Sequence, residues 1–198
     1  MEQLDYPLSL TFKIGTLAND FVARDRMGNV VVYVRQKLLK LIDEVQVYRD
    51  ESRSDLRYTL KANKWIDFST TYTFTNAQGQ EVGRVARQGW ASLWKAHYEI
   101  FDEQQQPDLT IREANPWVKV ADGLLGEVPI LGLLTGYFFN PSYLVTRPDG
   151  TLVARLTKKP SGLGRRFSLE KEAEFERGEE ERVLLSLMMM ILLERRRG

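Results

Sequence analysis

Apolar or β-branched residues alternate with polar ones in a series of short runs, and clusters of turn residues separate the runs. The runs carry the two-residue period of β-strands, and Asn, Asp and Gly supply the backbone angles that tight turns need. The pattern predicts five hairpins, with strand pairs over residues 20–24 and 29–35, 44–48 and 56–60, 71–74 and 81–87, 98–101 and 109–112, and 143–146 and 152–156. Residues 8–14 and 166–170 add two strands, so about twelve are expected.

The hairpins recur at roughly 25-residue spacing, which indicates repetition of one supersecondary unit whose copies differ too much for a solenoid. Two segments depart from this pattern. Residues 36–42 predict a short helical turn, and residues 115–141 form a long insertion containing Gly and Pro, with a helix expected near residues 117–125. No segment has the composition of an interdomain linker, so residues 1–198 are expected to form a single domain.

The C-terminal residues 179–198 predict a helix. Three glutamates stand at its start and three arginines at its end, which is the polarity that the helix dipole favours. Residues 183–193 are apolar apart from Ser186, and a helix that is apolar on every face must be enclosed. This stretch would be about 16 Å long, whereas spanning a bilayer takes roughly 20 residues. We therefore expect the protein itself to enclose it.

The dimensions of this helix predict how it is enclosed. Strands of five to six residues are about 17–20 Å long, close to the length of the apolar stretch. A helix with its side chains is about 10–12 Å across, and an eight-stranded barrel has little room beyond its own side chains. The sequence thus predicts a mainly β fold, a closed antiparallel barrel of about twelve strands around a central hydrophobic C-terminal helix.

Composition narrows the function classes. The 28 Lys and Arg residues against 27 Asp and Glu leave a net charge of +1, whereas nucleic-acid-binding domains are usually strongly basic. The absence of cysteine excludes disulfides, thiolate metal sites and cysteine nucleophiles, and it is compatible with the cytoplasm. The N-terminus lacks the pattern of a secretory signal. Residues 123–139 contain Glu127, Pro129 and four glycines, which argues against a transmembrane span.

Several short patterns resemble one known family. They are residues 32–39 and 183–187, the Gly-x-x-Val spacing in returning strands, and residues 111–113 with the Asn140-Pro141-x-Tyr143 pattern further on. Together they resemble the LURP-one-related proteins, a branch of the tubby C-terminal-like fold that also includes phospholipid scramblases. The resemblance implies a twelve-stranded barrel around a C-terminal helix. Tubby-type domains bind phosphoinositides and scramblases act on membrane lipids, but no lipid-binding position and no acidic calcium-binding segment can be carried over.

A candidate lipid-binding site lies in residues 158–166, where cations surround a Gly-containing loop: Lys158, Lys159, Arg165 and Arg166. Backbone N–H groups and bidentate arginines could bind the phosphate oxygens of an anionic headgroup there. The alternative is a solvated hairpin end whose cations protect a strand edge. The loop lacks the Gly-Lys-Ser/Thr ending of a nucleotide-binding P-loop.

Other candidates have a structural alternative each. Residues 195–197 either contact anionic lipid or satisfy the helix C-terminus. His97, the single histidine, is either a base or a structural residue. Aromatic residues either anchor at a membrane interface or fill the core, namely Trp65, Trp90, Trp94, Trp117, Tyr137, Phe138 and Phe139. Residues 188–190 are methionines, which suit irregular interior space.

Three functional hypotheses follow. The leading one is a non-enzymatic, cytoplasmic LURP-one-related or tubby-like domain that binds anionic phospholipid peripherally at a membrane surface. The second is a structural or protein-interaction module without a small ligand, and the third is a scramblase-like lipid-handling protein. No acid–base or nucleophile set is visible, so neither catalytic residues nor a cofactor nor a metal is expected, and no nucleic-acid partner.

Overall fold

The computed structural model describes residues 4–13, 20–36, 44–63, 70–88, 97–114, 141–160 and 166–195. Within these residues it contains one helix and twelve strands: β1 Leu8–Phe12, β2 Phe21–Arg24, β3 Val30–Gln36, β4 Glu44–Tyr48, β5 Leu56–Asn63, β6 Thr71–Asn76, β7 Glu81–Arg87, β8 His97–Phe101, β9 Pro107–Glu113, β10 Ser142–Thr146, β11 Leu152–Lys159, β12 Arg166–Lys171 and α3 Glu179–Arg195.

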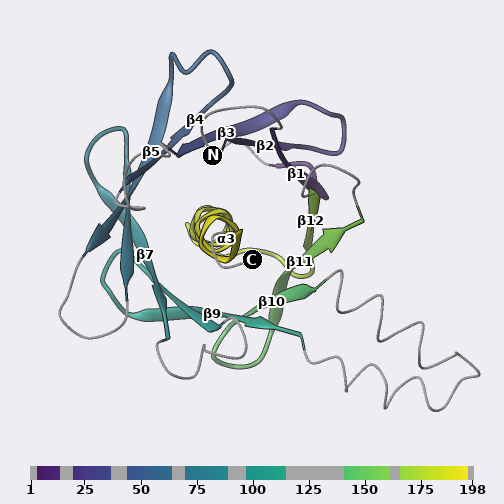
Figure 1. Cartoon of the computed structure of the whole chain (residues 1–198). Coiled ribbons are helices and arrows are strands. Elements are labelled where there is room, and N and C mark those ends of the chain that lie inside the picture. The colour runs from purple at the N-terminus through teal and green to yellow at the C-terminus, as the bar shows by residue number, and fades with distance from the viewer. Residues whose placement is uncertain are drawn as a thin grey trace, which may run out of the picture.

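The strands form a closed antiparallel barrel. Each strand pairs with its neighbours in the sequence, and β1 pairs with β12 to close the ring, with Leu8 opposite Leu169 and Leu10 opposite Phe167. Figure 1 shows the ring of strands with α3 running through its middle. Closure leaves none of these strands with a free edge, which removes the main route by which sheets aggregate.

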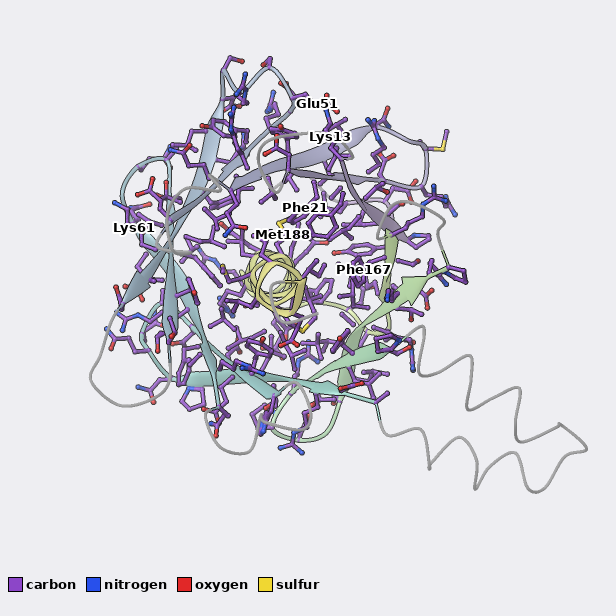
Figure 2. All side chains as sticks on the ribbon, viewed as in Figure 1. Lys13, Phe21, Glu51, Lys61, Phe167 and Met188 are labelled. Atoms are coloured by element: carbon purple, nitrogen blue, oxygen red, sulfur yellow. The ribbon has the colours of Figure 1, made fainter. Side chains whose placement is uncertain are left out.

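The alternation along the strands determines which side chains face α3. In β8, Tyr98 and Ile100 are buried while the residues on either side of each are half-buried, and β12 repeats the alternation with buried Phe167 and Leu169. In Figure 2, Phe21 and Phe167 lie inside the ring beside Met188 of α3, whereas Lys61 lies outside it. The inner rows and the helix together form one hydrophobic core.

The helix is enclosed along its apolar length. Residues 183–192 are at most 2% exposed, apolar except for Ser186. The predicted fold, a closed barrel of about twelve strands around a hydrophobic C-terminal helix, is therefore confirmed. Each predicted hairpin is present with boundaries that differ by a few residues. The largest differences are at the ends of β5 and β11, which extend to Asn63 and Lys159 instead of residues 60 and 156.

Two predictions fall partly or wholly outside the described residues. In the predicted helical turn over residues 36–42, Gln36 is the last residue of β3 and the rest are not described. The expected helix near residues 117–125 also lies outside the described part of the chain.

Ion pairs of two buried α3 residues, Glu179 and Arg182, fix the beginning of the helix. Arg147 donates from Nε and Nη2 to the two carboxylate oxygens of Glu179, at 2.8 and 2.7 Å. Arg182 donates from Nε to Asp108 at 2.7 Å and lies 3.3 Å from Glu103. These partners come from the tight turns of the barrel or the strands beside them, so α3 begins at the end of the barrel that carries the tight hairpin turns. We call this the turn end.

A second set of contacts fixes the other end of α3. The Tyr98 hydroxyl donates to Glu194 at 2.6 Å, and Arg87 lies 3.6 Å from the same carboxylate. The Arg87 guanidinium also lies over the Tyr98 ring. Because Arg87 ends β7 and His97 begins β8 next to Tyr98, α3 finishes at the opposite end of the barrel, which we call the exit end.

Candidate functional site

Two of the predicted lipid-binding cations face each other across neighbouring strands. Lys159, the last residue of β11, is directly opposite Arg166, the first residue of β12. Both lie on the outer row, because the residues next to them in the pairing, Lys158 and Phe167, belong to the inner row. Arg166 is exposed and Lys159 is half-buried.

The structure separates Lys158 from this pair. Lys158 is two residues from the buried Leu156 and directly opposite the buried Phe167, so it shares their side of the strand. Side chains alternate between the faces of a strand, and β11 continues through Lys159. Lys158 therefore lies in β11 and on the opposite face of the sheet from Lys159 and Arg166. Arg165 lies outside the described residues.

Hydroxyl groups surround the two cations on the outer row. Thr11 of β1 is directly opposite Arg166. Thr157 of β11 and Ser168 of β12 form the next outer pair, directly opposite each other. The Thr157 hydroxyl also lies 3.3 Å from that of Ser142 in β10. We call Lys159, Arg166, Thr11, Thr157 and Ser168 the outer patch.

The cations of the outer patch differ in their pairing from other cations nearby. Neither Lys159 nor Arg166 has an ion pair with a carboxylate in the part of the chain that the structure describes. By contrast, Arg155 of β11 is bound to Glu172 at 2.7 Å. Lys13, which directly follows β1, is bound to Glu51. The outer patch thus presents two donors that no described carboxylate neutralises, with hydroxyls beside them.

The alternative explanation for these cations, protection of a strand edge, does not fit the barrel. β11 pairs with β10 and with β12, and β12 pairs with β1. Neither strand has an edge to protect.

His97 lies on the outer row at the start of β8, directly opposite Arg112 of β9. Burial lowers the pKa of His97, and the positive charge of Arg112 lowers it further. Both effects favour the neutral imidazole.

The remaining candidates divide between the core and the undescribed residues. Met188, Met189 and Met190 are at most 1% exposed, so they fill the barrel as expected. The side chains of residues 195–197 are not described, and neither are the candidate aromatic anchors, Trp65, Trp90, Trp94, Trp117, Tyr137, Phe138 and Phe139. Among the described residues, no group of three or more His, Cys, Asp or Glu is arranged to hold a metal ion.

The one described helix is too short and too charged at its ends to count as a membrane span.

A family model described as LURP-one-related matches residues 30–189, which is most of the chain. The chain belongs to the LURP-one-related family. A search of curated proteins gave no match.

A solved structure supports the fold of this LURP-one-related chain. The X-ray structure of a protein from Arabidopsis thaliana is similar with a TM-score of 0.52, at 13% sequence identity, and covers 98% of this chain and 94% of the other. At this identity the similarity concerns the fold alone.

Sequence reasoning missed the hydroxyls of this LURP-one-related domain's outer patch. Thr157 and Ser168 could have been found by extending the alternation of β11 and β12 toward each other. Thr11 could not, because its place beside Arg166 depends on the closing pair of β1 and β12, which no local pattern predicts.

Proposed function

We propose that this LURP-one-related chain is a non-enzymatic domain that binds anionic phospholipid at a membrane surface through its outer patch. The observation that carries the proposal is the direct cross-strand pair of Lys159 and Arg166, which no carboxylate of the described residues neutralises. Like charges directly opposite each other in a sheet are destabilising. A phosphate group between them would remove the repulsion and gain two charge-assisted hydrogen bonds.

The groups around the pair suit a phosphorylated headgroup. An arginine offers a planar fork of N–H donors and a lysine offers a compact point charge. The hydroxyls of Thr11 and Ser168 lie beside these cations on the same outer row and can donate to further phosphate oxygens. Each cation near an anionic membrane contributes about 1 kcal/mol, so the pair contributes about 2 kcal/mol.

Vesicle sedimentation tests the proposal. The chain is mixed with phosphatidylcholine vesicles, with or without phosphatidylserine or a phosphoinositide. We expect binding that requires the anionic lipid, and a loss of about thirtyfold in the partition coefficient of the Lys159→Ala/Arg166→Ala variant, corresponding to about 1 kcal/mol per cation.

A matched control removes two cations from elsewhere. Arg26 and Arg177 are exposed and lie at the turn end, so Arg26→Ala/Arg177→Ala changes the net charge by the same amount. We expect this control to bind like the parent chain. Equal losses in both variants would contradict the outer patch, and equal binding to neutral and anionic vesicles would contradict lipid recognition by charge.

The same vesicles test the non-enzymatic part of the proposal. We expect the lipid composition to stay unchanged after long incubation, and fluorescent lipid to stay in its original leaflet. Release of a headgroup would show hydrolysis, and movement between leaflets would favour the scramblase-like alternative.

A further inference from the structure

A hollow of about 440 Å³ lies on the outer face of β6, β7 and β8. Its lining includes Thr71, Arg84, Ala86, Glu99, Phe101 and Gln105, and every residue of the lining belongs to the described part of the chain. Figure 1 shows β7 on the left of the ring and β12, which carries part of the outer patch, on the right. The volume lies within the usual range of small-ligand sites, about 300–1,000 Å³. We call this hollow the β7 groove.

Two outer rows of the sheet form the surface of the β7 groove. Thr71 of β6 and Glu99 of β8 flank Ala86 directly, and Arg84 lies directly opposite Phe101 in the next row. These side chains face outward, because the residues that alternate with them are buried: Tyr72, Val85 and Ile100. From the usual strand spacing and rise, the two rows across three strands cover roughly 10 Å by 7 Å. The small Ala86 side chain in the middle leaves room for a ring-sized ligand.

The lining combines hydrogen-bond donors, hydrogen-bond acceptors and an aromatic ring. The Glu99 carboxylate is half-buried and only accepts hydrogen bonds, and within the described residues no group donates to it. The Arg84 guanidinium only donates, whereas the Thr71 hydroxyl and the Gln105 amide do both. Phe101 is also half-buried and adds an apolar surface. A ligand that matches this lining has several hydroxyl or amide groups together with an apolar face.

The charges around the β7 groove favour a neutral ligand. Arg84 donates from Nε and Nη2 to the two carboxylate oxygens of Glu81, so its charge is already neutralised. The Glu99 carboxylate would repel an anion. A cation would be attracted to Glu99, but the exposed Arg112 of β9, one pair further along the same outer face, reduces this attraction. Asp102 at the turn end of the groove is bonded to two backbone N–H groups of its own turn.

Gln105 occupies a backbone position that favours glycine. Each of the five tight hairpin turns that the structure describes has a residue with positive φ whose N–H donates to the carbonyl three residues earlier. In three turns this residue is a glycine, and in the other two it is Arg53, with φ 59°, or Gln105, with φ 66°. A residue other than glycine is strained there, and such strain is often found at binding sites. The need for the Gln105 side chain in the groove explains why glycine is absent from this turn.

From this lining we propose that the β7 groove binds a neutral saccharide, either free or as the headgroup of a glycolipid. One face of a sugar ring is apolar and can pack on the Phe101 ring, while the hydroxyls at the edge of the sugar both donate and accept hydrogen bonds. Glu99 accepts hydrogen bonds from two neighbouring hydroxyls, and Thr71 and Gln105 bind the others. The inference goes beyond the proposed function, because it uses none of the residues of the outer patch.

Chemical-shift titration of the isotopically labelled chain tests the proposal. The free probes are glucose, galactose, mannose, maltotriose and cellotriose, and spermidine and inorganic phosphate represent cations and anions. We expect at least one saccharide to shift the amide signals of Thr71, Ala86, Glu99 and Phe101 saturably. Sedimentation with galactosylceramide in phosphatidylcholine vesicles is the lipid-linked arm, and binding in that arm alone would identify a glycolipid as the source of the ring.

Two results of these titrations would overturn the proposal. One is the lack of any response in the groove to the free saccharides together with the lack of binding to the glycolipid vesicles. The other is tighter binding of spermidine or phosphate in the groove than of every saccharide, because charge and not the sugar ring would then be recognised.

A glycine variant separates binding from folding. Gln105→Gly removes the side chain and suits the positive φ, so we expect no loss of stability in urea and saccharide binding that is about fivefold to tenfold weaker, as for one or two lost hydrogen bonds. Arg53→Gly makes the same change at the corresponding position of the β4–β5 turn and is expected to bind like the parent chain. Equal affinities of the two variants would contradict a role of Gln105 and overturn the site.

The β7 groove and the outer patch can be tested separately. We expect Lys159→Ala/Arg166→Ala to bind the saccharide like the parent chain, and Gln105→Gly to bind anionic vesicles like the parent chain. Glu99→Gln keeps the shape of the side chain and is expected to weaken saccharide binding about tenfold, because it removes a charged acceptor. Saccharide binding lost in Lys159→Ala/Arg166→Ala but kept in Glu99→Gln would place the sugar at the outer patch and overturn the inference.

Discussion

At the scale of single residues, Gly83 shows how closely the barrel wall approaches the helix. Its φ of +149° is a conformation that other residues rarely adopt. A Cβ atom there would lie 2.7 Å from the Phe101 carbonyl oxygen and 2.7 Å from the Cδ atom of Arg182. The Phe101 oxygen belongs to the backbone and cannot move aside.

We expect Gly83→Ala to lower the free energy of unfolding by about 2–3 kcal/mol, as overpacking against a rigid neighbour does. Urea unfolding measures the change. Gly79→Ala, in the turn beside it, is the control: its φ is also positive, but no atom lies within 4 Å of the new Cβ. A Gly83→Ala variant no less stable than Gly79→Ala would contradict the steric argument.

Ser186 is the polar exception in the apolar length of α3. Its side chain is fully buried, and its hydroxyl has no hydrogen-bond partner among the residues that the structure describes. A buried hydroxyl without a partner costs about 1–3 kcal/mol, and alanine is also the better helix former. We expect Ser186→Ala to raise the free energy of unfolding by about 1 kcal/mol, measured by urea unfolding. A loss of stability would indicate that the hydroxyl is satisfied in solution.

The candidate site was only partly predictable at this scale. The sequence indicated Lys159 and Arg166, but it placed the end of β11 three residues too early, so Lys158 was assigned to a loop. The residues Thr157-Lys158-Lys159 carry no apolar alternation, although Lys158 lies on the inner row opposite Phe167. The strand continues there through its hydrogen bonds to β12, which a hydrophobic pattern does not record.

At the scale of elements, α3 was the most predictable part of the molecule. Its uniform apolar character required enclosure, and its length matched the strands. We expect Met189→Asp to prevent folding, since it would place an unpaired charge in the core. Met189→Leu, which conserves volume, is expected to cost less than about 1.5 kcal/mol. Circular dichroism and thermal unfolding check both variants, and a folded Met189→Asp chain of unchanged melting temperature would contradict burial.

The ion pairs that fix the beginning of α3 were not predictable, because they join residues remote in sequence. Glu179 has a side chain that is 2% exposed, and Arg147 holds it in a bidentate pair. Removing Arg147 would leave the buried Glu179 carboxylate without its counter-ion, although still bonded to the Glu176 backbone N–H, and such a loss costs up to about 3–5 kcal/mol.

We therefore expect Arg147→Met to lower the free energy of unfolding by about that amount, measured by urea unfolding. Arg155→Met is the control, since Arg155 pairs with Glu172 on the surface, and it is expected to cost at most about 1 kcal/mol. Similar losses in the two variants would show that burial of the pair at the turn end does not matter.

At the scale of the whole molecule, buried phenols link stability to alkaline pH. Burial raises the pKa of Tyr33 to about 12, and its hydrogen bond to Asp20 adds to the shift. Burial likewise raises the pKa of Tyr6, Tyr58 and Tyr98, with glutamates of α3 adding to each shift. The folded chain thus keeps phenolic protons that the unfolded chain loses near pH 10.

Because the folded state binds more protons above pH 10, stability falls as pH rises from about 10 towards 12. Below pH 10 these groups are protonated in both states and add no pH dependence. We expect the urea midpoint to decline over this range, and to decline less steeply in Tyr33→Phe. Parallel declines in both proteins would show that Tyr33 does not contribute.

Closure of the ring by β1 and β12, with α3 as the following element, has a consequence for synthesis. Translation delivers all twelve strands before the segment that fills the space between them, and the first strand must wait for the last. Partners so far apart in the chain make folding slow. A nascent chain with its strands released but α3 still inside the ribosome has an apolar lining and nothing to cover it, so chaperones have their longest opportunity at that moment.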